Sequence, residues 1–246
     1  MSAAIVVRRG LFPLPAALAA VGVAAVAVIA LAWHGSGGGG PARPPAAAVS
    51  ARGTASQPAP QLPVLDLAGL TWRSFHGVML PSSPAAGPRD TAGGTAAGFS
   101  DTPLGALVAA VNIGIRANAQ WGPGIYSPEI RRDVTGPSAP QLLADCQSGY
   151  ASQARADGIS GGQPLGSVTV TVKAFRWIAY TPAAALLDLV SAGPGSQGGT
   201  VMASAQLEVV WEHGDWRLVA PPGGDFGNSA AVLTSLAGYT VFPGQG

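Results

Sequence analysis

Two glycine-containing stretches match patterns that carry chemistry in other proteins. Residues 158–162 satisfy G-x-S-x-G, the turn that presents a serine nucleophile between a strand and a helix. Here a predicted helix precedes the turn and a predicted strand follows it, which is the reverse order. Residues 193–198 satisfy G-x-G-x-x-G, but they open a strand, so no helix N-terminus is present to receive a phosphate. We interpret both stretches as loops in a chain with 35 glycines.

The side chains that could bind a metal are scattered along the sequence. His34, His76 and His213 form no H-x-x-x-H or H-x-H pair, and Cys146 is the only cysteine. A zinc site needs several such ligands at suitable spacing, and a single thiol excludes an internal disulfide. We therefore expect no metal site and no cofactor.

Few residues are candidates for catalysis or ligand binding. Asp101 could act as a carboxylate in a pocket, but it directly precedes a predicted helix, where a solvated acidic side chain is favoured by the helix dipole. Trp211 and Trp216 bracket a predicted hairpin, where cross-strand packing is a more common role than a ligand cage. We expect no catalytic residue, and we interpret the protein as not an enzyme.

Charge is divided unevenly along the chain. Residues 1–62 carry four arginines and no acidic side chain, whereas residues 63–246 carry nine basic and twelve acidic side chains. A nucleic-acid-binding domain normally concentrates positive charge. We therefore expect no direct nucleic-acid binding by the larger part of the chain.

A long apolar run lies near the N-terminus. Leu11–Trp33 contains no charged side chain, and Arg8 and Arg9 precede it. As a helix it would span about 35 Å, enough to cross a hydrocarbon core of about 30 Å. The flanking arginines favour a cytoplasmic N-terminus. The sequence predicts a single-pass cell-membrane protein, attached to the membrane through Leu11–Trp33, with an extracytoplasmic C-terminal domain.

A cleaved signal peptide is the alternative interpretation of the same run. Residues 30–32 read Ala-Leu-Ala, a pattern that a signal peptidase could cut, although the apolar run is longer than usual. Both interpretations export the rest of the chain. We thus expect a cytoplasmic N-terminus (1–10), the anchor (11–33), a disordered Gly/Pro/Ala-rich linker (34–63) and an extracytoplasmic α+β domain (64–246).

Two helices and a following set of strands should build this domain. Thr102 and Pro103 supply a cap and a first residue for a helix to about Ala119. A second helix should start at Ser138, with a capping box to Gln141, and end before Gly158. Residues 64–81 suggest a strand, 120–137 an irregular segment with a short turn, and 229–236 a short helix.

The C-terminal half alternates in the manner of β-strands. Residues 167–180 change parity near Ala174, which predicts a bulge. Further strands are expected at 183–191, 200–212 and 215–220, the last two joined by a turn at residues 213–214. Helices followed by strands indicate an α+β fold. We expect a cone-like domain of two or three helices packed on a curved antiparallel sheet, behind the transmembrane helix.

Two stretches resemble a known group of proteins. Residues 98–106, Gly-Phe-Ser-Asp-Thr-Pro-Leu-Gly-Ala, resemble the Gly-Phe-x-x-Thr-Pro-x-Gly-Ala signature of actinobacterial membrane proteins found with integrative conjugative elements. Residues 210–218 resemble the Trp-x-x-Gly-Asp-Trp-Arg-Leu hairpin of that group and of nuclear-transport-factor-2-like domains. The signature has Ala-His where Ser100 and Asp101 stand, so no role of that histidine carries over.

The resemblance implies a function in assembly. The group of conjugative-element membrane proteins is similar to the assembly factors of type IV secretion systems, which contribute to a conjugative channel through oligomeric contacts. We therefore expect a non-enzymatic scaffold component with protein partners in a membrane complex, which could include copies of itself. Two alternatives stay open: an exported module that binds a small ligand in the mouth of the cone, or an enzyme with a buried carboxylate beside an apolar pocket.

Overall fold

The computed structural model describes residues 62–167, 169–195 and 198–244. The predicted span Leu11–Trp33 and nearly all of the predicted linker lie outside the described residues. Within the described ranges, no helix is both long enough and apolar enough to cross a membrane.

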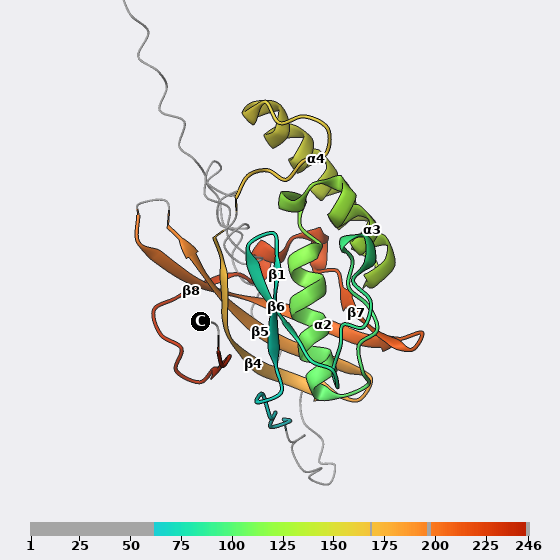
Figure 1. Cartoon of the computed structure of the whole chain (residues 1–246), viewed down its shortest axis with the longest axis vertical. Helices are drawn as coiled ribbons and strands as arrows, with labels where there is room; N and C mark the ends of the chain where they lie inside the picture. Colours follow the sequence, from blue (N-terminus) through green and yellow to red (C-terminus); the bar gives the residue numbers. More distant parts are fainter. Residues whose placement is uncertain (1–61, 168, 196–197, 245–246) are drawn as a thin grey trace, which may run out of the picture.

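The described chain begins with a hairpin, continues through three α-helices and ends in a large sheet (Figure 1). The hairpin consists of β1 (Thr71–Phe75) and β2 (Val78–Ser82), and four short 3-10 turns, η1 to η4, interrupt the loops. The remaining elements are α2 (Pro103–Arg116), α3 (Pro123–Asp133), β3 (Val134–Thr135), α4 (Ala139–Asp157), β4 (Thr171–Thr181), β5 (Ala184–Pro194), β6 (Thr200–Glu212), β7 (Asp215–Val219), β8 (Ala231–Leu233) and β9 (Thr240–Val241).

The large sheet has the strand order β3-β7-β6-β5-β4-β9, and β8 pairs with β6 beside this path. β4, β5, β6 and β7 form an antiparallel meander, whereas β3 pairs with β7 in parallel. Register shifts in β4 between Val172 and Ala174 and between Trp177 and Ala179 bend the strand. The first shift confirms the predicted bulge.

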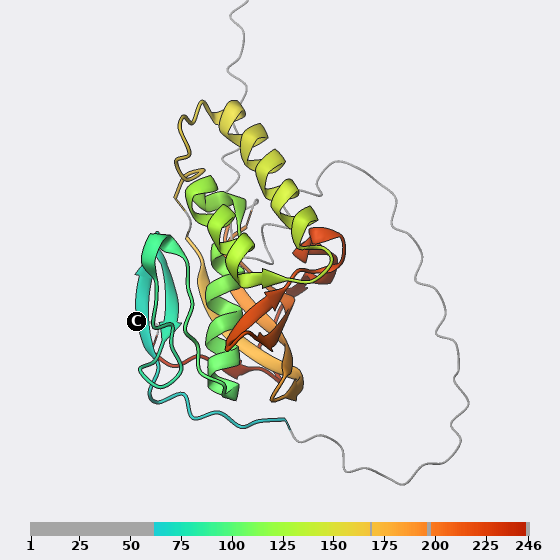
Figure 2. The same cartoon turned by 90° about the vertical axis from the view of Figure 1, so that its right-hand side faces the viewer.

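Helix α2 lies between the sheet and the hairpin, and Figure 2 shows these three layers side by side. Twelve of its fourteen residues are buried. The sequence shows an apolar stripe on one side, and alanines and glycines cover most of the rest. The buried polar side chains Asn112 and Arg116 both have hydrogen-bond partners, so the helix can be buried on all sides. Thr102 caps its first turn, because its Oγ1 accepts a hydrogen bond from the backbone N–H of Gly105 at 3.0 Å.

The predicted fold class was a cone of two or three helices packed on a curved antiparallel sheet, behind a transmembrane helix. This prediction is wrong. One helix, α2, covers the inner face of the sheet, and the hairpin β1–β2 forms a further layer outside it. α4 packs against α3 and η3 instead of lying across the strands. The physical reason is the side of α2 that carries Asn112 and Arg116. Asn112 donates to the carbonyl oxygen of Pro81 at 2.9 Å and Arg116 lies over the Phe75 ring, so the hairpin covers this side of the helix.

Several single elements also differ from the sequence-based expectation. Residues 71–82 form a hairpin because His76 and Gly77 both adopt positive φ, the geometry of a tight two-residue turn. The segment expected to be irregular contains α3, with Pro123 in its first turn. Ser138 makes no side-chain cap, so the predicted capping box is absent from α4. Residues 229–236 contain β8 rather than a helix.

Candidate functional site

The two motifs that carry the resemblance lie against each other. The carboxylate of Asp215 accepts hydrogen bonds from the backbone N–H groups of Gly98 and Phe99, at 2.6 and 2.9 Å. The indole N–H of Trp216 donates to the carbonyl oxygen of Ser100 at 2.9 Å. These contacts fasten the loop before α2 to the hairpin of β6 and β7. In this protein the two motifs therefore serve the packing of α2 on the sheet.

A buried polar cluster lies beside α2. The Arg116 guanidinium donates to the carbonyl oxygen of Gly94 at 3.0 Å and to the side-chain oxygen of Asn112 at 2.7 Å. Its carbon Cζ lies 4.3 Å from the centre of the Phe75 ring, a cation–π contact between helix and hairpin. Burial lowers the pKa of Arg116 to about 10. The cluster joins α2 to the hairpin and to the loop around η1.

Two acidic side chains of α3 are buried next to this cluster. Glu129 is 0 % exposed, and its Oε2 accepts the backbone N–H of Ala96 at 3.0 Å. Burial, reinforced by the charge of Asp133, raises the pKa of Glu129 to about 9 despite the opposing charge of Arg116. Burial raises the pKa of Asp133 to about 6, opposed by Arg132. Glu129 is therefore protonated at neutral pH, and it could act as a proton donor only for a molecule that reaches it.

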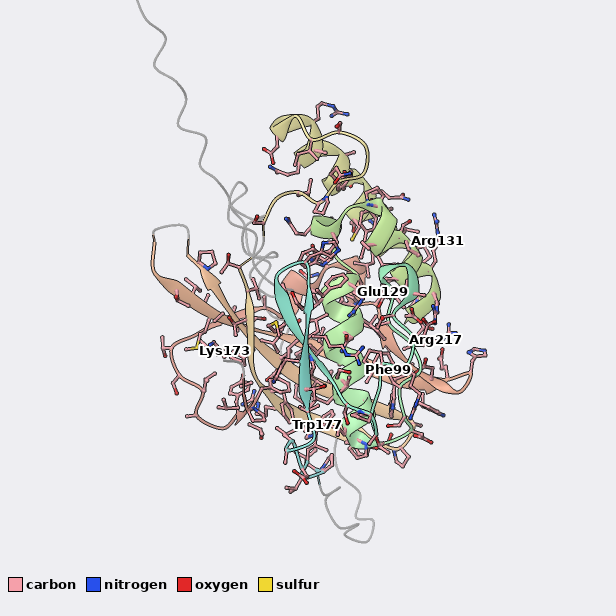
Figure 3. All side chains as sticks on the ribbon, viewed as in Figure 1. Phe99, Glu129, Arg131, Lys173, Trp177 and Arg217 are labelled. Atoms are coloured by element: carbon pink, nitrogen blue, oxygen red, sulfur yellow. The ribbon has the colours of Figure 1, made fainter. Side chains whose placement is uncertain are left out.

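Two cavities in the described part of the chain have linings that include neither of these carboxyl groups. One cavity, of about 170 Å³, lies between the hairpin and α2 and includes Arg116 and Asn112 in its lining, but not Glu129 or Asp133. Figure 3 places Glu129 and Arg217 on one side of the molecule and Lys173, the only lysine, on the other. Arg116 and Asn112 thus line a cavity, whereas Glu129 and Asp133 line neither of these two cavities.

A larger cavity lies on the opposite face of the sheet, and we call it the outer groove. Its volume is about 470 Å³, and its floor is formed by Leu186 of β5 and by Gln206 and Glu208 of β6. The walls come from the β3–α4 connection (137–138), the end of β7 with η3 (219–222), and the η4 region (225–229).

The outer groove exists because β6 lacks a neighbouring strand there. β8 pairs with β6 over Met202–Ser204 and β7 pairs over Val209–Glu212, so no described strand pairs with residues 205–208 on that side. The hydroxyl of Ser229 accepts the backbone N–H of Gln206 at 3.1 Å and closes part of the gap. The groove is thus a notch in a rigid sheet, a shape suited to an extended segment or a small molecule.

The residues singled out from the sequence do not meet in one site. His76 and His213 occupy hairpin turns with positive φ, and Asp101 is exposed before α2. Cys146 is buried, and burial raises the pKa of its thiol to about 12. Within the part of the chain that the structure describes, no three His, Cys, Asp or Glu side chains are placed to bind a metal.

Sequence reasoning missed Glu129 and Asp133 and the outer groove. Both carboxyl groups lie in a segment expected to be irregular, because acidic residues and Pro128 interrupt its apolar pattern. The signal available for this helix was Pro123, since proline is favoured in a first turn. The groove is formed by parts far apart in sequence and has no local signature.

Comparison with protein families gave one match. A family model described as Domain of unknown function (DUF8175) matches residues 34–241. Comparison with curated proteins and with solved structures gave no match.

Proposed function

We propose that this chain, which belongs to the DUF8175 family, is a non-enzymatic scaffold component of a conjugative transfer apparatus of the type IV secretion kind. In this proposal its folded domain acts outside the cytoplasm through contacts with other proteins, and the segment Leu11–Trp33 attaches it to the cell membrane. The resemblance of residues 98–106 and 210–218 to conjugative-element membrane proteins supports the cellular setting.

One observation carries the proposal. The inner face of the sheet is filled by α2 and its neighbours, while the outer groove, a cavity of about 470 Å³, lies on the opposite face. A catalytic version of this fold would need its raised-pKa carboxyl group, Glu129, beside a pocket, and neither described cavity includes it. A filled interior with a notch on the outside favours docking over chemistry.

Small-molecule binding is the second candidate. The volume of the outer groove falls within the range of about 300–1,000 Å³ that ligand sites occupy. The two candidates differ in what accompanies the protein when it is isolated from cells, because a scaffold carries other chains with it.

Affinity purification of the full-length protein from gently solubilised native membranes tests this proposal. We expect secretion or channel subunits to co-purify with the wild type, and to be lost with Leu186→Arg, which places a charge on the floor of the groove. Ile178→Arg is the matched control, because Ile178 is 39 % exposed on β4 and does not line the groove. Isolation of the wild type without any other chain would contradict the scaffold role, and loss of partners with Ile178→Arg alone would contradict the groove as the docking surface.

A further inference from the structure

The outer groove has a defined charge. Its lining contains the carboxyl groups of Glu208 and Asp225 and no lysine, arginine or histidine. Glu208 is exposed on the floor beside the half-buried Leu186, and three prolines stand in the walls. A carboxylate next to an apolar side chain fits a guanidinium on its aliphatic stem.

The chain itself contains a segment with the complementary chemistry. Residues 41–61 include Arg43, Arg52 and five prolines, and they contain no acidic side chain. Proline favours an extended backbone that loses little conformational entropy on binding. The family match begins at residue 34, so it includes this segment together with the folded domain.

Only a short connection separates this segment from the folded domain. Nine residues lie between Arg52 and Leu62, where the described chain begins, and the extended backbone from Arg52 to Leu62 spans at most roughly 35 Å. Figure 2 shows that the first described residues pass beneath α2 toward the side of the sheet that α2 leaves uncovered. The chain therefore approaches the domain from the side on which the groove opens.

We propose that the residues around Arg52, within the segment 41–61, bind in the outer groove of their own chain, with Arg52 beside Glu208. A partner that docks in the groove must then displace this segment, so its arrival would release the domain from the membrane-proximal linker. This consequence rests on the proposed function, whereas the binding itself rests on the charge of the groove, its shape and the length of the connection described above.

Trypsin cleavage after Arg52 in the full-length protein in detergent tests the binding. Arg43 precedes a proline and is a poor trypsin site, so Arg52 reports on the segment alone. We expect cleavage at least about tenfold slower than in a synthetic peptide of residues 41–61, and a return close to the peptide rate in Glu208→Lys. Glu212→Lys is the matched control, because it changes the same charge on the same strand outside the groove.

Three outcomes would overturn the proposal. Equal rates for the wild type and the free peptide would show that the segment is not held. Equal rates for Glu208→Lys and Glu212→Lys would show that the groove does not hold it. A cleavage rate that rises on tenfold dilution of the protein would assign the segment to a second copy.

High salt provides a further check. We expect cleavage after Arg52 in the wild type to become faster at high salt, because salt screens the attraction between exposed charges such as Arg52 and Glu208.

Discussion

Replacing Glu129 with glutamine is expected to remove most of the loss of stability that the wild type shows as pH rises above neutral. Glu129 has a folded pKa of about 9 against 4.5 in the unfolded chain. Between these values the folded state holds a proton that the unfolded state has released, so raising the pH favours unfolding. In this range the free energy of unfolding falls by about 1.4 kcal/mol per pH unit. A glutamine cannot ionise, so the free energy of unfolding of the variant lacks this pH dependence.

Thermal unfolding followed by tryptophan fluorescence between about pH 7 and 8.5 measures the effect. This window lies above the folded pKa of Asp133, about 6, and below the pH at which Cys146 contributes. Over the window the wild type should lose about 2 kcal/mol relative to Glu129→Gln, a difference of roughly 4–8 °C in Tm. Glu208→Gln, at an exposed carboxyl group on β6 away from Glu129, serves as the control and should keep the wild-type slope. Parallel profiles for the wild type and Glu129→Gln would contradict the burial of an ionisable Glu129.

Replacing Gly105 with alanine is expected to unfold the domain or to destabilise it by more than about 3 kcal/mol. An added Cβ would lie 2.0 Å from the carbonyl oxygen of Ser100. That oxygen is held by the indole of Trp216 at 2.9 Å, so the loop cannot move without breaking the contact between the two motifs. The expected loss tests the conclusion that residues 98–106 serve packing.

Gly124→Ala in α3 is the matched control. No atom lies within 4 Å of an added Cβ at this exposed position, and alanine is favoured over glycine in a helix by about 0.5–1 kcal/mol. Denaturant unfolding of both variants measures the difference. A Gly105→Ala protein as stable as the wild type would contradict the close packing of the loop on α2.

Local signals in the sequence predicted the best-defined elements. Thr102 and Pro103 fix the start of α2, and Gly158 ends α4 in a left-handed conformation. The alternation in residues 200–212 corresponds to β6, and the turn at His213 forms as expected. In each case the determining interaction lies within a few residues of the chain, so the pattern alone was sufficient.

Tertiary interactions determined what the sequence did not reveal. Glu129 is polar, yet it is buried because Ala96 from a distant loop supplies its hydrogen bond. The full burial of α2 depends on the hairpin β1–β2, whose turn at His76 has a weak local signal. The outer groove depends on where β7 and β8 leave β6, which no single segment encodes.

The central claim is that this domain works by docking rather than by chemistry, and DNA transfer from cells of the native host tests it most directly. A strain lacking the gene would be complemented with the wild type, with the double variant Glu129→Gln/Asp133→Asn, or with Leu186→Arg, at matched protein levels. We expect wild-type transfer frequency from the double variant and a loss of at least about tenfold with Leu186→Arg. Loss of transfer with the double variant and normal transfer with Leu186→Arg would contradict the account, as would normal transfer without the gene.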